Sequence, residues 1–143
     1  MLRCMLFLVC CALALPATAF EEPARGTQLR RDLMDAMRPI AEWNLGAPVE
    51  FVVQELRVSG DVAFAMLFAQ RPGGGPIDIR TTPMVTRDEL EPDYIDGPSF
   101  HALLKRSGRM WVAVNHATGP TDAWWYWKEF CPIWYTVLPE TCQ

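Results

Sequence analysis

Hydrophobic residues recur with a helical period between Thr27 and Gly46. They follow the i, i+4, i+8 and i+11 spacing of one helix face, while charged residues hold the opposite face. Thr27 belongs to the residue types that cap helix N-termini. The pattern predicts a helix that begins after Thr27, ends before Gly46 and carries an apolar stripe of Leu29, Leu33, Met34, Met37, Ile40 and Ala41. Trp43 falls near this stripe, so we expect it in the core.

Two later stretches share another pattern, in which apolar arms flank a short turn that contains glycine. One turn is Ser59-Gly60-Asp61 and the other is Ser107-Gly108, and glycine supplies the positive φ of tight hairpin turns. Residues 77–82 could add a further short strand. The predicted fold is therefore α+β, with an N-terminal helix packed on a curved antiparallel sheet of four to five strands.

Large and small side chains alternate along residues 62–70. Alternation places the large residues on one face of a strand and the alanines on the other. This suits a strand that packs a helix on its small side or a thick core on its large side.

Seven aromatic residues crowd into residues 124–135. Thr121 and Asp122 suit the start of a short aromatic helix over residues 123–130, which Pro132 would end. So many large rings are hard to bury against a sheet from one short helix. They either complete the core or form an exposed platform for a sugar ring or a protein partner. The candidate binding residues are Trp124, Trp125, Trp127 and Trp134.

The first nineteen residues have the pattern of an export signal. Arg3 gives a positive start, Met5 to Leu15 are apolar, and Pro16-Ala-Thr-Ala19 resembles a cleavage site. The apolar run is too short to span a bilayer. We expect cleavage after Ala19, no stable membrane insertion afterwards, and a periplasmic or secreted protein whose residues 20–143 form a single domain.

Two of the five cysteines, Cys131 and Cys142, remain after cleavage. In an oxidising compartment such a pair predicts a disulfide that fastens the C-terminal tail. The sequence lacks the Cys-x-x-Cys spacing that would indicate a metal site, and we expect no cofactor. Cleavage removes one charged residue, Arg3, and takes the formal net charge from −4 to −5. A mildly acidic chain without basic clusters argues against nucleic acid as a partner.

Both histidines beyond the leader, His101 and His116, lie on the second hairpin. A two-residue turn would put them on one face of the sheet, and a three-residue turn would put them on opposite faces. On one face they could form half of a zinc site or an acid–base pair, with Asp122 as a third ligand or an orienting carboxylate. Alternatively, the rings are ordinary sheet residues and Asp122 caps the following helix.

A helix followed by an antiparallel meander resembles the cystatin-like and nuclear transport factor 2-like layouts, in which a helix lies across a curved sheet. The stretches 51–64 and 102–112, with Gly119-Pro-Thr-Asp122, also resemble small exported bacterial proteins over about residues 27–127. That resemblance implies no catalytic residues.

The pattern as a whole favours an exported, non-catalytic binding module whose partner is a protein or an envelope glycan. Two alternatives stay open. One is a small metal-dependent or histidine-using hydrolase, and the other is a structural envelope component that dimerises through a sheet edge.

Overall fold

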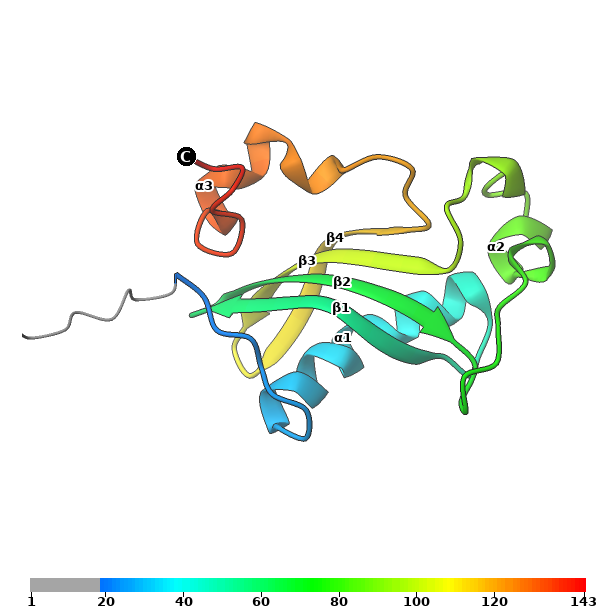
Figure 1. The fold of residues 1–143 in the computed structure, drawn as a ribbon, viewed down its shortest axis with the longest axis horizontal. Coiled ribbons are helices and arrows are strands. Elements are labelled where there is room, and N and C mark those ends of the chain that lie inside the picture. The colour runs from blue at the N-terminus through cyan, green and yellow to red at the C-terminus, as the bar shows by residue number, and fades with distance from the viewer. Residues whose placement is uncertain (1–18) are drawn as a thin grey trace, which may run out of the picture.

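The computed structural model describes residues 19–143, which form three layers (Figure 1). Helix α1 (Gln28–Leu45) covers one face of a four-stranded antiparallel sheet, and the C-terminal segment covers part of the other face. The strands are β1 (Glu50–Ser59), β2 (Val62–Gln70), β3 (Ser99–Ser107) and β4 (Met110–Thr118), and two short helices are α2 (Pro83–Thr86) and α3 (Cys131–Trp134). This confirms the predicted α+β fold. Residues 1–18 of the predicted export signal lie outside the described residues.

Helix α1 forms as its hydrophobic pattern predicts. The hydroxyl of Thr27 accepts a hydrogen bond from the backbone N–H of Arg30 at 3.3 Å, which caps the first turn. The apolar stripe faces the sheet and buries Leu33, Met34, Met37, Ala41 and Leu45.

A single arginine holds the C-terminal end of α1. The guanidinium of Arg71, which follows β2, donates hydrogen bonds to the carbonyls of Leu45 at 2.9 Å, of Pro48 at 3.0 Å and of Gly46. These carbonyls include ones that a helix end leaves without an intrahelical partner, and a cation there also complements the helix dipole. Arg71 thereby fixes the end of α1 to the end of β2.

Trp43 is exposed, which corrects its predicted place in the core. Its side chain retains 65% of its accessible surface. Trp43 is two residues away from both Ala41 and Leu45, so it points about 200° around the helix from these buried positions. The guanidinium of Arg87 lies over the indole instead, 4.5 Å from the ring centroid.

The antiparallel sheet has the order β1-β2-β3-β4, with two-residue hairpin loops between β1 and β2 and between β3 and β4, and with residues 71–98 between β2 and β3. Ser59 pairs with Val62 and Ser107 pairs with Met110, so Gly60-Asp61 and Gly108-Arg109 are the loops. Each loop begins with a glycine at positive φ. Residues 77–82 do not form the further strand that we considered, because Asp78 caps a 3₁₀ turn, Ile79–Thr81, through the N–H of Arg80.

Each outer strand contains a β-bulge. In β1, Gln54 has no partner between the pairs Val53–Leu67 and Glu55–Met66. In β4, Val114 has no partner between Ala113 and Asn115. One extra residue reverses the face on which every following side chain lies.

The two faces of the sheet carry two separate cores. The small residues Ala63, Ala65 and Ala69 of β2 lie in the core on the α1 side of the sheet. The large residue Phe64 faces the C-terminal segment together with Leu103 of β3. The alternation in β2 therefore predicted the side on which the helix packs.

One arginine joins the two ends of the described chain. The guanidinium of Arg57 lies 5.0 Å from the ring centroid of Phe20 and 5.6 Å from that of Phe64. It also donates hydrogen bonds to the carbonyl of Val137 at 3.1 Å and to the carboxylate of Glu140 at 2.7 Å. The N-terminal segment, the sheet and the C-terminal tail meet at this side chain.

Candidate binding surface

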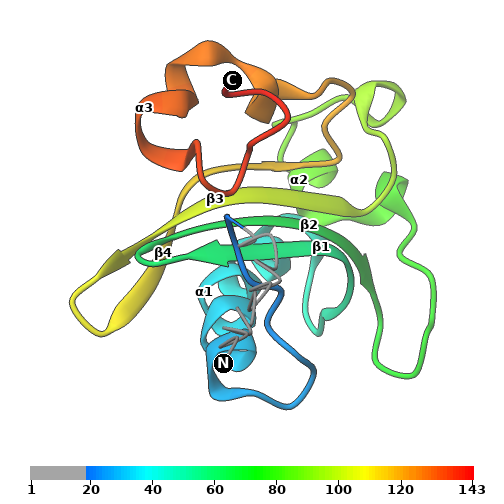
Figure 2. The ribbon, with the colours of Figure 1, turned by 60° about the vertical axis from the view of Figure 1, so that its left-hand side comes forward.

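Residues 120–143, here called the C-terminal cap, form a compact layer on the outer face of the sheet (Figure 2). The chain enters the cap at Gly119, which has a φ of 59°. A Cβ there would lie 2.2 Å from Cγ2 of Ile95 and 2.8 Å from the carbonyl oxygen of Gly97. Only glycine fits both the conformation and the space, so this residue sets the direction of the cap.

The cap is more irregular than the helix predicted over residues 123–130. It contains two 3₁₀ turns, Trp124–Tyr126 and Lys128–Phe130, and then α3. Pro132 lies in the first turn of α3 instead of ending a helix, because the first turn does not need its N–H. No side chain caps the turn at Trp124, so Asp122 does not have the capping role that we expected.

A disulfide between Cys131 and Cys142 closes the cap, as the sequence predicted. It ties α3 to the tail over a sequence separation of 11 residues. Between the two cysteines, Trp134 donates its indole N–H to the carbonyl of Leu104 in β3 at 2.9 Å. The cap is thus fastened both to itself and to the sheet.

Three of the four candidate tryptophans point toward the sheet. The exposed fractions are 8% for Trp124, 8% for Trp125 and 3% for Trp134. They form the second core with Phe64, Leu103, Phe130, Val137 and Leu138. Trp127 alone of the four candidates is open to solvent, at 53%.

Trp127 is one of four large side chains that the cap leaves exposed. Its indole stacks on the ring of buried Phe130, with the planes 10° apart and the centroids separated by 6.4 Å. We call Tyr126, Trp127, Ile133 and Tyr135 the aromatic face, and each is between 43% and 58% exposed. Sequence spacing did not single out Ile133 or the two tyrosines, because irregular turns have no fixed period that separates inward from outward residues.

The two histidines lie on opposite faces of the sheet. His101 pairs with Ala117 on the outer face, whereas His116 pairs with Ala102 on the α1 face and stacks on Phe100 at 5.9 Å. The hairpin loop has two residues, which by itself would put both rings on one face. The bulge at Val114 adds one residue to β4 and turns His116 to the other side.

His101 is enclosed between the sheet and the cap. It is 7% exposed, its ring meets Trp125 edge-on at 4.6 Å, and its Nδ1 atom has no hydrogen-bond partner. Burial lowers the pKa of His101, and the negative charge of Asp96 partly offsets this effect. Burial also lowers the pKa of His116. The structure does not bring His101, His116 and Asp122 together, and residues 19–143 contain no cluster of three potential metal-ligating side chains.

The burial of His101 leads us to expect that the folded protein loses stability in mild acid. Because the pKa of His101 is lower in the folded protein than in the unfolded chain, the unfolded chain binds a proton more readily. The free energy of unfolding therefore suffers no loss from His101 above about pH 6.5, and it decreases as the pH falls below that value. Urea unfolding of a protein that comprises residues 20–143, at a series of pH values between about 8 and 5, measures this decrease.

A glutamine at position 101 tests whether protonation of His101 causes the loss of stability. His101→Gln removes the titrating group, so its free energy of unfolding should vary less with pH than that of the wild type. His116→Gln should have a smaller effect because His116 is more exposed. An acid-induced loss that is the same in wild type and His101→Gln would contradict the prediction.

The chain has no match among protein-family models, curated proteins or solved structures. No helix within residues 19–143 has both the length and the apolar character needed to cross a membrane.

Proposed function

We propose that this protein is an exported, non-catalytic interaction module that binds a protein partner through its aromatic face. The exposed stack of Trp127 on Phe130 carries this proposal. Phe130 is buried and its ring lies nearly parallel to the Trp127 indole, which restricts the orientation of the exposed indole. A large ring held in this way contributes contact area at little conformational cost.

The composition of the aromatic face favours a protein over a glycan. A sugar ring needs a flat aromatic platform, which Trp127 alone would supply. The aromatic face also presents aliphatic Ile133 and two tyrosines over ten residues of the chain. Tyrosine and tryptophan are enriched in protein–protein interfaces, where they combine an apolar body with a polar edge.

The disulfide supports export, because such bonds persist in oxidising compartments. The signal-like residues 1–19 point to the same destination. The hydrolase alternative has less support, because the bulge at Val114 separates the two histidines by the thickness of the sheet. The dimer alternative draws on one observation: Met110, Val112 and Val114 are exposed on edge strand β4.

Trp127→Ala should weaken partner capture while it leaves the fold intact. The oxidised mature protein would be immobilised and exposed to envelope and medium extracts of the producing cells. Loss of a central tryptophan costs about 2 kcal/mol or more of binding free energy, or roughly a thirtyfold loss of affinity. Titration of the captured partner against both proteins measures the difference.

Tyr94→Ala is the matched control, because Tyr94 is 76% exposed and lies outside the cap. It should bind as the wild type does, and both variants should keep the wild-type melting temperature. Protease treatment of the extract should remove the partner, whereas glycosidase treatment should not. Capture that is indifferent to Trp127→Ala would rule out the aromatic face as the contact surface.

A further inference from the structure

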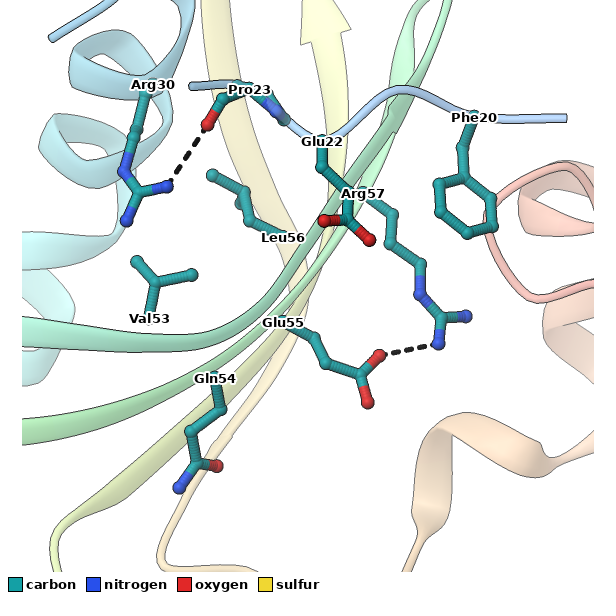
Figure 3. Close-up of a pocket in the computed structure, with 9 residues that line it drawn as sticks. All are labelled: Phe20, Glu22, Pro23, Arg30, Val53, Gln54, Glu55, Leu56 and Arg57. Atoms are coloured by element: carbon teal, nitrogen blue, oxygen red, sulfur yellow. Dashed lines mark hydrogen bonds and ion pairs between the residues drawn. The ribbon is translucent and has the colours of Figure 1, made fainter. Parts of the chain in front are cut away.

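Strand β1 forms an edge of the sheet that the protein itself uses only in part. The N-terminal segment runs beside this strand (Figure 3) and pairs with it through an isolated bridge between Glu21 and Val58. There, the backbone N–H of Glu21 donates to the carbonyl of Val58 at 2.8 Å, and the N–H of Val58 donates to the carbonyl of Glu21 at 2.9 Å. This pair shows that the edge of β1 that faces away from β2 accepts an antiparallel strand.

The other end of β1 offers the same kind of backbone groups without a partner. Ala69, which is opposite Phe51 in the ladder, donates its N–H to Pro98 on the far side of β2 at 2.8 Å. In an antiparallel ladder, the groups of Phe51 then face away from β2, and those of Val53 do so as well. No backbone group within residues 19–143 bonds to them.

A hollow follows this open edge. One cavity of about 290 Å³ lies between β1 and the N-terminal segment, where Arg30 and Pro23 close one end and the Glu55–Arg57 ion pair lies near the other (Figure 3). A second cavity of about 450 Å³ lies further along β1 and shares Arg30 and Val53 with the first. Together they provide space beside the unpaired backbone of β1.

The second cavity has an excess of positive charge. Arg25 and Arg30 line it, and neither forms an ion pair with a carboxylate within residues 19–143. Arg30 uses one N–H group to bond the carbonyl of Pro23 at 3.1 Å. The acid in the lining, Glu50, accepts a hydrogen bond from the N–H of Gly73 at 3.1 Å. Arg25 and Arg30 therefore line the cavity with hydrogen-bond donors to spare, and guanidinium is well matched to carboxylate.

We propose that residues 50–53 of β1 form a docking site for an extended acidic peptide segment of a protein partner. The segment adds to the sheet as a fifth strand and bonds the backbone of Phe51 and Val53. Its carboxylates, at alternate positions, are held by Arg25 and Arg30. The intervening side chains point to the outer face, where Val52 is 45% exposed.

The bulge at Gln54 limits the length of this site. Residues 50–53 pair regularly with residues 67–70, and the register changes immediately afterwards. A bulge in an edge strand bends the ladder and prevents long, indiscriminate pairing. A short segment with defined charges is therefore admitted, whereas a long flat strand is not. This surface is separate from the aromatic face, and the proposal does not depend on the function proposed above.

A selection from a random decapeptide library tests the proposal with the mature, disulfide-bonded protein as target. Enriched peptides should carry aspartate or glutamate at alternate positions. On binding, they should slow amide hydrogen exchange at Phe51 and Val53. The double variant Arg25→Ala/Arg30→Ala should bind them at least about tenfold more weakly, because charge-assisted hydrogen bonds are lost.

Two matched controls show whether binding depends on this site in particular. Arg31→Ala/Arg109→Ala removes two arginines that do not line the second cavity and should bind the enriched peptides as the wild type does. Trp127→Ala should also bind them unchanged. Enriched peptides without acidic residues, peptides that leave exchange at Phe51 and Val53 unaltered, or a selection that enriches none would overturn the proposal.

Discussion

Replacement of Trp134 by alanine is expected to lower the free energy of unfolding by about 3 to 5 kcal/mol. Trp134 is 3% exposed and lies in the second core. Alanine leaves a cavity among Phe64, Phe130 and Leu138 that a cap closed by a disulfide cannot readily collapse. It also removes the donor to the carbonyl of buried Leu104. Urea unfolding at neutral pH, with tryptophan fluorescence and circular dichroism as probes, measures the loss.

Two further substitutions divide this effect into its parts. Trp134→Phe keeps most of the apolar volume but not the indole N–H, so it should cost about 1 to 3 kcal/mol for the carbonyl left unpaired. Trp127→Ala removes a tryptophan of the same cap from a half-exposed position and should change stability little. A Trp134→Ala protein as stable as Trp127→Ala would show that the cap contributes little to the fold.

Loss of the Cys131–Cys142 disulfide is expected to destabilise the protein by about 3 kcal/mol. The bond closes a loop over a sequence separation of 11 residues, and the chain-entropy model assigns roughly this value to a loop of such length. The Cys131→Ser/Cys142→Ser variant and the wild type with dithiothreitol should show the same decrease in urea unfolding. In a protein that begins at Phe20, these are the two cysteines present, so the reductant acts on one bond.

The position of the loss within the fold is the sharper test. Hydrogen exchange should accelerate in residues 124–142, because the second core depends on the closed cap. Exchange in α1 should change less, because α1 packs in a separate core. Uniform acceleration throughout the chain would instead show that the two cores unfold as one unit.

Helix α1 and the sheet face that it covers could be predicted because these elements are regular. A period of 3.6 residues from Leu29 to Ala41 predicted α1, and the alanines of β2 predicted where α1 packs. Trp43 was misplaced because a residue beside an apolar stripe can fall on either side of the boundary. Here Arg87 provides it with a partner outside the core.

For the C-terminal cap, the sequence predicted which residues take part but not how they are arranged. The aromatic residues and the disulfide could be identified, but 3₁₀ turns give no period from which to tell buried Trp125 from exposed Trp127. The bulge at Val114 likewise has no sequence marker, since any residue can occupy it. A one-residue insertion without a signal was enough to place His116 on the face opposite His101.

The contacts of Arg57 determine which part of the fold can form only after the last residues have been synthesised. Its bond to Glu140 joins residues 83 positions apart, and Phe20 lies against the same guanidinium. The β1–β2 hairpin links residues much closer in sequence, and such local contacts form early, whereas α1 packs mainly against the last strand, β4. A chain that emerges from its N-terminus can therefore form this hairpin early, whereas the packing of α1 needs β4 to be present. The second core can form only when the final residues are present. A truncated or stalled chain therefore leaves Phe64 and Leu103 exposed to solvent.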